Sequence, residues 1–209
     1  CCPSLKYNQR MRWTPRIEKA IKKAAVLHRA QTRRGSIDYP YITHLVSVAT
    51  ILAHYTSDED ILIAGLLHDT IEDTDYTFEQ LEDDFGMRVR TIVDGVTEKK
   101  GNNGERLPWM TRKKDYLETL KNAPEESLLV SAADKIHNLR SLIEEHRIMG
   151  NEFWPMYARL TDPEAIEKAK QVRLQSFGDI LAVLKARGGS LPIVKELEEV
   201  YEEARGVFT

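Results

Sequence analysis

Apolar residues recur at helical spacing along almost the whole chain. Thr14-Pro15 matches a capping residue followed by proline at the first helical position, and apolar residues then return every three to four positions. The same periodicity predicts further helices at about 42–55, 58–72, 87–96, 111–122, 125–149, 163–187 and 191–205. The segments 32–41 and 99–107 are predicted to be loops, and no segment alternates as a strand does. The pattern therefore predicts an all-α fold.

Capping residues mark several of the predicted helix ends. Thr77, with Gln80 three residues later, matches a capping box, and Gly86 matches a helix stop. No repeat, low-complexity tract or linker divides the 209 residues. We expect a single domain, with a helical-bundle core at 14–150 and C-terminal helices at 151–209 packed on it.

The composition narrows the classes of partner. A net charge of −3 argues against a protein that coats nucleic acid, because such proteins carry a basic footprint. No apolar run reaches the roughly 18 residues of a membrane span, and the basic start of the chain has no apolar signal segment. Cys1 and Cys2 are adjacent, which is a poor arrangement for a structural disulfide. We expect a cytoplasmic protein without nucleic-acid or membrane partners, and leave open whether it forms a homo-oligomer.

The most informative segment follows the apolar run at 61–67. One imidazole and three carboxylates, on His68, Asp69, Glu72 and Asp73, fall within six positions. On a continuous helix Glu72 lies one turn beyond His68, so these side chains share a face. On its own, such a cluster is more typical of ion pairs at a helix end than of a metal site.

Two other apolar segments each carry one potential metal ligand. His44 interrupts an apolar helical pattern, and Asp134 follows an apolar run, where a carboxylate is costly to bury without a cation. Alone, His44 is more typical of a hydrogen-bonded core histidine. Together, His44, His68, Asp69 and Asp134 form a set of two histidines and two carboxylates, which suits Mn, Fe or Zn better than Mg or Ca. Such a metal lowers the pKa of water and polarises a phosphoryl group, so the set predicts hydrolysis of a phosphate ester.

Six segments carry a resemblance to a known family. They are Arg33-Arg34, 39–44, 66–74, 85–86, 93–97 and 133–140. In this order they resemble the HD phosphohydrolase superfamily, and more closely the hydrolase domain of the bacterial stringent-response enzymes. The similarity extends from about residue 16 to residue 150, and no synthetase or regulatory domain fits in the remaining residues. The chain therefore looks like a stand-alone small alarmone hydrolase, with an HD-domain helical bundle and a C-terminal helical extension.

The resemblance implies a Mn²⁺-dependent enzyme that removes pyrophosphate from the 3′ position of guanosine tetra- and pentaphosphate, (p)ppGpp, and returns GDP or GTP. It implies that the two histidines and two carboxylates above hold one metal ion. It also implies that Glu72 and Asp73 activate the attacking water or protonate the leaving oxygen. The residues implied to hold the nucleotide are Arg33, Arg34 and Asn138.

Further cations and two departures bear on the substrate. Arg112 and Lys113 are candidates for binding the distal phosphates, although charge in an amphipathic helix is equally typical of a solvated face. Leu45 stands where the family often has proline, and the loop at 35–38 looks longer than in the large enzymes. Because this loop shapes the base pocket, an adenine alarmone or NADPH is an alternative substrate.

Other activities stay open as well. A nucleotidase or a cyclic-nucleotide phosphodiesterase would share the metal site, and a non-catalytic nucleotide-binding domain is a less favoured alternative. The Glu72-Asp73 pair and the Arg33-Arg34 loop favour the alarmone hydrolase over these classes. His137 sits off the face of Asn138, so we expect it to pack or to orient a metal ligand.

Overall fold

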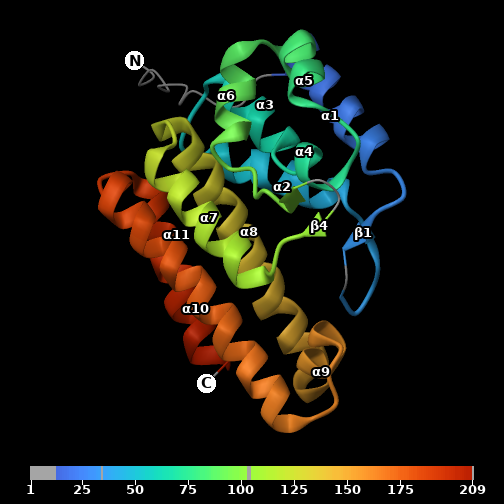
Figure 1. Cartoon of the computed structure of the whole chain (residues 1–209), viewed down its shortest axis with the longest axis vertical. Helices are drawn as coiled ribbons and strands as arrows, with labels where there is room; N and C mark the ends of the chain where they lie inside the picture. Colours follow the sequence, from blue (N-terminus) through green and yellow to red (C-terminus); the bar gives the residue numbers. More distant parts are fainter. Residues whose placement is uncertain (1–12, 34, 103–104, 209) are drawn as a thin grey trace, which may run out of the picture.

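The computed structural model describes residues 13–33, 35–102 and 105–208, and its regular elements are helices except for two short strand pairs (Figure 1). The all-α prediction is confirmed. Arg34 lies outside the described residues, and so do Cys1 and Cys2. The helices are α1 (Pro15–Leu27), α2 (Ile42–Leu52), α3 (Glu59–Leu67), α4 (Thr70–Asp73), α5 (Phe78–Phe85), α6 (Met87–Asp94), α7 (Trp109–Asn122), α8 (Glu125–Met149), the 3-10 turn η1 (Gly150–Glu152), α9 (Phe153–Ala158), α10 (Pro163–Gly188) and α11 (Pro192–Phe208).

Both predicted loops contain a short antiparallel strand pair, which the sequence did not indicate. β1 (Thr32–Arg33) pairs with β2 (Tyr39–Pro40), and β3 (Gly101–Asn102) pairs with β4 (Glu105–Arg106). Each strand has two residues, which is too short for an alternation of apolar and polar positions to be visible. The first pair matters for the site because Arg33 and Tyr39 line the cavity described below.

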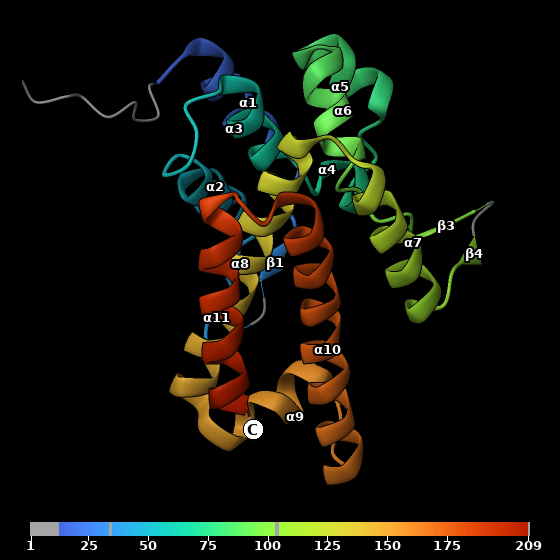
Figure 2. The same ribbon diagram turned by 90° about the vertical axis from the view of Figure 1, so that its left-hand side faces the viewer.

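The long helix α8 is the centre of the packing. Helices α2, α3, α10 and α11 all pack against it, and Figures 1 and 2 show α10 and α11 lying side by side along it. One hydrophobic core joins Leu45 of α2, Leu66 of α3, Ile136 of α8, Leu184 of α10 and Leu197 of α11. Burying each such side chain contributes roughly 1.5–3 kcal/mol to folding. Because residues of α10 and α11 belong to this core, these two helices stabilise the same folded unit as α2, α3 and α8. The domain boundary at residue 150 stays a prediction.

The capping signals in the sequence are realised at the helix ends. Thr14 caps α1 by accepting from the Ile17 N–H at 3.1 Å. Thr77 and Gln80 form the reciprocal capping box of α5, with bonds of 3.0 and 3.3 Å. Gly86 joins α5 to α6 at a φ of 93°, a conformation that L side chains rarely adopt.

The helix predicted at 58–72 is interrupted, and this is a correction with consequences for the site. α3 ends at Leu67, α4 begins at Thr70, and Asp69 between them has φ −93° and ψ −5°. The Thr70 hydroxyl donates to the Leu67 carbonyl at 2.6 Å, which satisfies one of the carbonyls freed at the end of α3. Ile71 keeps helical spacing to Leu67 across the break, so the periodicity could not reveal it.

Among the described residues, no helix combines the length and the apolar character needed to cross a lipid bilayer. The cavity that the helices enclose is lined from α2, α4, α7, α8, α9 and α10, from the β1–β2 pair and from the turn between α3 and α4. Its lining therefore joins segments that are more than 100 residues apart in the chain.

Candidate functional site

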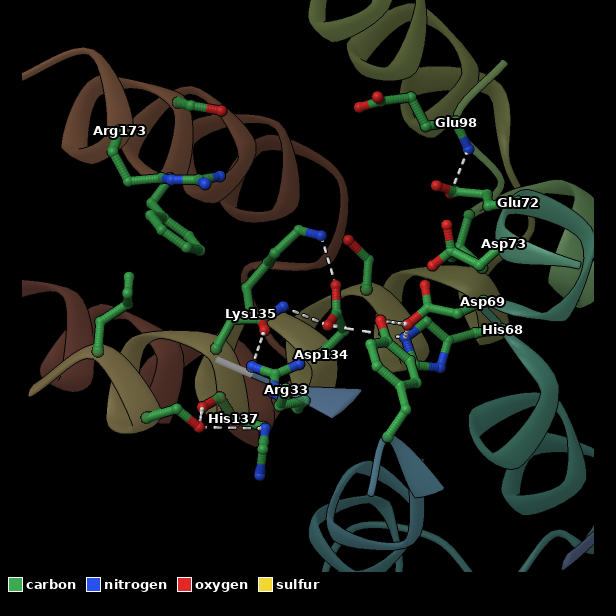
Figure 3. Close-up of a pocket in the computed structure, with 18 of the residues that line it drawn as sticks. Arg33, His68, Asp69, Glu72, Asp73, Glu98, Asp134, Lys135, His137 and Arg173 are labelled. Atoms are coloured by element: carbon green, nitrogen blue, oxygen red, sulfur yellow. Dashed lines mark hydrogen bonds and ion pairs between the residues drawn. The ribbon is translucent and has the colours of Figure 1, made fainter. Parts of the chain in front are cut away.

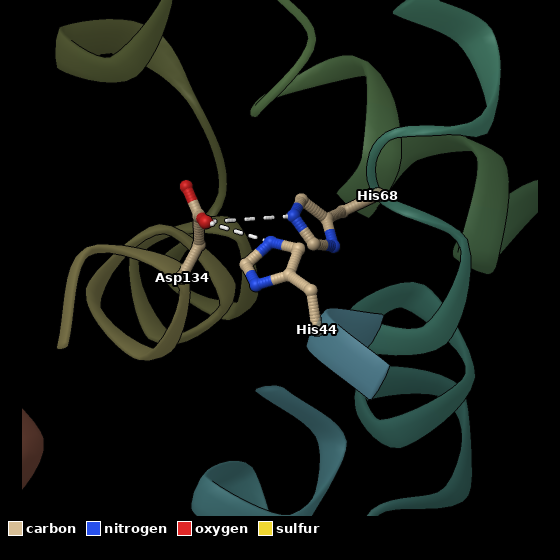
Figure 4. Close-up of side chains that lie close together, drawn as sticks. All are labelled: His44, His68 and Asp134. Atoms are coloured by element: carbon tan, nitrogen blue, oxygen red, sulfur yellow. Dashed lines mark ion pairs between the residues drawn. The ribbon is translucent and has the colours of Figure 1, made fainter. Parts of the chain in front are cut away.

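The four predicted metal ligands meet where α2, α8 and the end of α3 converge. His44 Nε2 lies 3.2 Å from Asp134 Oδ1, and His68 Nε2 lies 3.6 Å from the same oxygen (Figure 4). Asp69 Oδ2 lies 3.5 Å from His44 Nε2 and 3.2 Å from His68 Nε2. The ligand atoms of His44, His68 and Asp134 all fall within 4.8 Å of one another, and all three residues are buried. The structure thus brings together every residue of the predicted set.

Hydrogen bonds behind the two imidazoles aim their Nε2 atoms at the cluster. His68 Nδ1 lies 2.9 Å from the Gly65 carbonyl, which can only accept, so Nδ1 carries a proton. In the neutral ring that a metal ion binds, the lone pair is therefore on Nε2. That buried Nε2 has no hydrogen-bond partner among the described residues. His44 Nδ1 contacts His137 Nδ1 at 2.9 Å. Burial, with the His44 and Arg33 charges, lowers the pKa of His137 to about 3, so His137 is neutral. Its contact with His44 is compatible with orienting that ligand, which stays a prediction.

The charges of the cluster complement a divalent cation. Burial alone would lower the pKa of His68, but Asp69 and Asp134 raise it well above its usual range. Burial alone would raise the pKa of Asp134, but Lys135 and the two histidines hold it well below its usual range. The two histidines likewise hold the pKa of the half-buried Asp69 well below its usual range, against the effect of burial. Both carboxylates therefore stay ionised, and His68 Nε2 lies between them. Imidazole nitrogens with carboxylate oxygens, so arranged, fit a divalent metal ion.

Neighbouring side chains hold both carboxylates in place. The Tyr41 hydroxyl donates to Asp69 Oδ2 at 2.7 Å, and Asn138 Nδ2 donates to Asp134 Oδ1 at 2.5 Å. Lys135 Nζ donates to Asp134 Oδ2. The contact of Asn138 follows from its position one turn beyond Asp134, whereas Tyr41 and Lys135 had no role in the sequence interpretation. Their signal was only their adjacency to motif residues.

The cluster opens into a cavity of about 880 Å³. Figure 3 shows His68, Asp69, Asp73 and Glu72 following one another along one wall, with Asp134 across from them. Glu72 Oε1 accepts from the backbone N–H of Glu98 at 2.5 Å. Burial and the Asp69 charge raise the pKa of Glu72 to about 8.

Asp73 and the predicted nucleotide-binding residues have different partners. Asp73 Oδ1 is ion-paired with Lys100 from the start of the β3–β4 segment. Arg33 Nη2 donates to Asn138 Oδ1 at 2.8 Å, and its guanidinium lies 5.9 Å from the centre of the Tyr41 ring. Arg33 and Asn138, both predicted to hold the nucleotide, line the cavity.

Arg112 and Lys113 face the cavity but are not simple solvated cations. Arg112 Nη1 and Lys113 Nζ donate to the two oxygens of Glu98. Burial, with the Lys135 charge, lowers the pKa of Lys113. The sequence interpretation missed Glu98, because one glutamate beside a loop has no spacing that would single it out.

The helices after residue 150 supply the far wall of the cavity. Arg173 on α10 donates to the Tyr157 hydroxyl on α9 at 2.6 Å, and its guanidinium lies 5.3 Å from the centre of that ring. Phe153 and Phe177 line the same region. No site residue was predicted here, since the resemblance ends near residue 150 and α9 was not expected at all. These positions become site residues only through the packing of α10 against α7 and α8.

Comparison with known proteins places this geometry in a context. Residues 20–166 match a family model described as an HD domain. The guanosine-3′,5′-bis(diphosphate) 3′-pyrophosphohydrolase MESH1 of Xenopus tropicalis is 43% identical over 128 residues, which are 60% of this chain and 69% of that protein. The enzyme of the same description from Haemophilus influenzae is 36% identical over 153 residues, 68% of this chain but 22% of that protein.

A solved structure is similar over nearly the whole chain. It is described as a metazoan ortholog of SpoT that hydrolyzes ppGpp and plays a role in starvation responses. It superposes with a TM-score of 0.74 at 28% identity, and the match covers 94% of this chain and 99% of that one. The similarity therefore includes the C-terminal helices, beyond the part where the sequence motifs lie. The family model matches well over half of the chain, including all four residues of the metal cluster. The chain therefore belongs to the HD-domain family.

Proposed function

We propose that this protein is a Mn²⁺-dependent 3′-pyrophosphohydrolase of (p)ppGpp, which releases pyrophosphate and GDP or GTP. The observation that carries the proposal is the common cavity of the metal cluster, the Glu72-Asp73 pair and several cations. The described relatives that share the HD domain and act on guanosine-3′,5′-bis(diphosphate) support the choice of substrate.

The residues of the cavity have separable roles in this reaction. His44, His68, Asp69 and Asp134 would hold the Mn²⁺, which when bound lowers the pKa of water and polarises the phosphoryl group. Glu72 takes the proton of the attacking water, because its raised pKa of about 8 is near the pH at which a general base works best. Asp73 orients that water or passes a proton to the leaving oxygen.

The substrate is held from both sides of the metal cluster. Arg33 and Asn138 bind the nucleotide on the β1–β2 side. Arg34, which is not among the described residues, is proposed to bind it as well. Arg112 and Lys113 with Glu98 leave one net positive charge at the wall of α7, which favours the phosphates. The proposed partner is therefore a small nucleotide rather than a nucleic acid or a membrane. We further propose a cytoplasmic location, and homo-oligomers are compatible with the proposal.

Mn²⁺ is expected to stabilise the folded chain. A metal at 100 times its Kd that binds only the folded state contributes about 2.7 kcal/mol. At about 2–4 °C per kcal/mol for a domain of this size, Mn²⁺ should raise the Tm of chelator-treated protein by roughly 5–10 °C, measured by scanning fluorimetry. Asp134→Ala is the matched control, whose Tm Mn²⁺ should leave unchanged. An equal shift in that variant would place the metal elsewhere.

A product-resolved assay tests the substrate. Mn²⁺-loaded protein is incubated with guanine and adenine alarmones, NADPH and cyclic nucleotides, and the products are separated by anion-exchange chromatography. We expect pyrophosphate and GDP from guanosine tetraphosphate at a higher kcat/KM than any product of the other compounds. Preference for the adenine alarmone would change the base alone. Turnover of cyclic nucleotides without turnover of either alarmone would refute the proposed function.

A further inference from the structure

Glu98 lies beside Glu72 in the cavity wall and touches it only through the main chain. Its backbone N–H donates to Glu72 Oε1 at 2.5 Å, while Figure 3 shows its own carboxylate turned away from Glu72. Among the described residues no hydrogen bond reaches Glu72 Oε2. The N–H of residue 98 therefore selects which oxygen of Glu72 is left to accept a proton.

Both oxygens of the Glu98 carboxylate are held by cations from α7. Arg112 Nη1 donates to Oε1 and Lys113 Nζ donates to Oε2. Glu98 is 7% exposed and Arg112 is 8% exposed, so water does little to screen this contact. A buried, charge-assisted pair of this kind is costly to break from one side. The side chain of Glu98 is thus fixed relative to α7.

The main chain on the other side of Glu98 is fixed as well. Thr97 follows the end of α6, and its hydroxyl donates to the Val93 carbonyl at 2.8 Å. Residue 98 is therefore anchored to α6 through Thr97 and to α7 through its own carboxylate. With both anchors in place, its N–H has little freedom to move away from Glu72.

We propose that Glu98 is a positioning residue for Glu72, whose ion pairs with Arg112 and Lys113 hold the N–H that orients the proton-accepting carboxylate. The inference rests on the proposed function, because Glu72 accepts a proton only in that reaction. The rival explanation is that Glu98 occupies Arg112 and Lys113 until a substrate phosphate displaces it. Under that explanation Glu98 affects substrate binding, and its removal lowers KM.

A double-mutant cycle separates the two explanations. Wild type, Glu98→Gln, Glu72→Gln and the double variant are loaded with Mn²⁺ and assayed on guanosine tetraphosphate, the slow variants with enzyme in excess. Since a displacement of about 1 Å can cost up to about 100-fold, we expect Glu98→Gln to lower kcat by on the order of 10- to 100-fold with KM unchanged. In the Glu72→Gln background the same substitution should leave kcat unchanged, because no proton acceptor remains to be positioned.

The content of bound Mn²⁺ and a control variant separate this effect from general disruption. Glu98→Gln should keep one Mn²⁺ per chain by elemental analysis. Arg88→Gln, which breaks an ion-pair network with Asp58, Asp60 and Glu126 at the surface, is the control and should keep the wild-type kcat. If Glu98→Gln fails to fold, Glu98→Asp carries the same test, since it retains the charge but shortens the reach. Its smaller loss of kcat should likewise vanish in the Glu72→Gln background.

Two results would overturn the inference while wild type is active. One is an equal loss of kcat from the Glu98 substitution in both backgrounds, which means that Glu98 does not act through Glu72. The other is an unchanged kcat with a lowered KM, which is the result of the rival explanation. If wild type does not turn over guanosine tetraphosphate at all, the proposed function fails, and this inference fails with it.

Discussion

Replacing Asp69 with alanine is expected to remove the bound metal and the activity together. Asp69 Oδ2 lies 3.2–3.5 Å from both histidine Nε2 atoms, so its loss leaves Asp134 as the one carboxylate of the cluster. A catalytic metal stabilises the transition state by several kcal/mol, so we expect kcat/KM to fall on the order of 1,000-fold. Metal content after gel filtration and the turnover of guanosine tetraphosphate are the two measurements.

Asp115→Ala is the matched control for this prediction, because Asp115 is exposed on α7 and away from the cavity lining. It should keep both the metal and the activity. Should Asp69→Ala keep one metal ion per chain yet lose activity, Asp69 acts on water or substrate. The ligand set would then shrink to His44, His68 and Asp134, whose ligand atoms meet within 4.8 Å without it.

The metal cluster could be predicted from the sequence because its members contrast with their surroundings. His44 and Asp134 interrupt or end apolar segments, and both prove to be buried. A buried polar group needs a partner, so each of these residues pointed to a ligand before any contact was known. The same reasoning predicted the contact of Asn138 with Asp134, since residues four apart share a helix face.

The parts that could not be predicted depend on tertiary packing or on very short elements. The break between α3 and α4 leaves the apolar periodicity intact, so a continuous helix was the natural expectation. Glu98 and Arg173 carry ordinary charges in ordinary surroundings along the chain. They become part of the site only because α7 and α10 pack together around the cavity. Local pattern contains no record of that placement.

Arg112 and Lys113 show how a charge predicted for a ligand can be engaged within the protein. From the sequence they were candidates for binding phosphates or, equally, part of a solvated face, and the structure pairs both with a buried glutamate. A buried pair contributes less net attraction to an incoming phosphate than two solvated cations would suggest. The pairing also fixes the position of Glu98, whose backbone N–H donates to Glu72. Precision of geometry is thus the main consequence of the pairing.

Replacing Glu72 with glutamine is expected to abolish proton transfer while keeping the metal. Glutamine has the same shape and can still accept the N–H of Glu98 through its amide oxygen, so the wall should be undisturbed. It cannot take up a proton, and we expect kcat to fall by roughly 100- to 10,000-fold, the usual contribution of a general base. Metal content should match wild type, and Glu79→Gln, at an exposed position on α5, should change neither quantity.

The pH dependence gives this prediction a second, independent reading. A general base works in its deprotonated form, and burial and the Asp69 charge raise the pKa of Glu72 to about 8 in the metal-free chain. A bound cation offsets the Asp69 charge, so in the Mn²⁺-loaded enzyme kcat should rise with pH through a value at or below that number, and this rise should disappear in Glu72→Gln. Loss of metal from Glu72→Gln would make Glu72 a ligand, and an unchanged kcat would transfer the role of base to Asp73. In either case the hydrogen bond from Glu98 would need a different purpose, so the two experiments constrain each other.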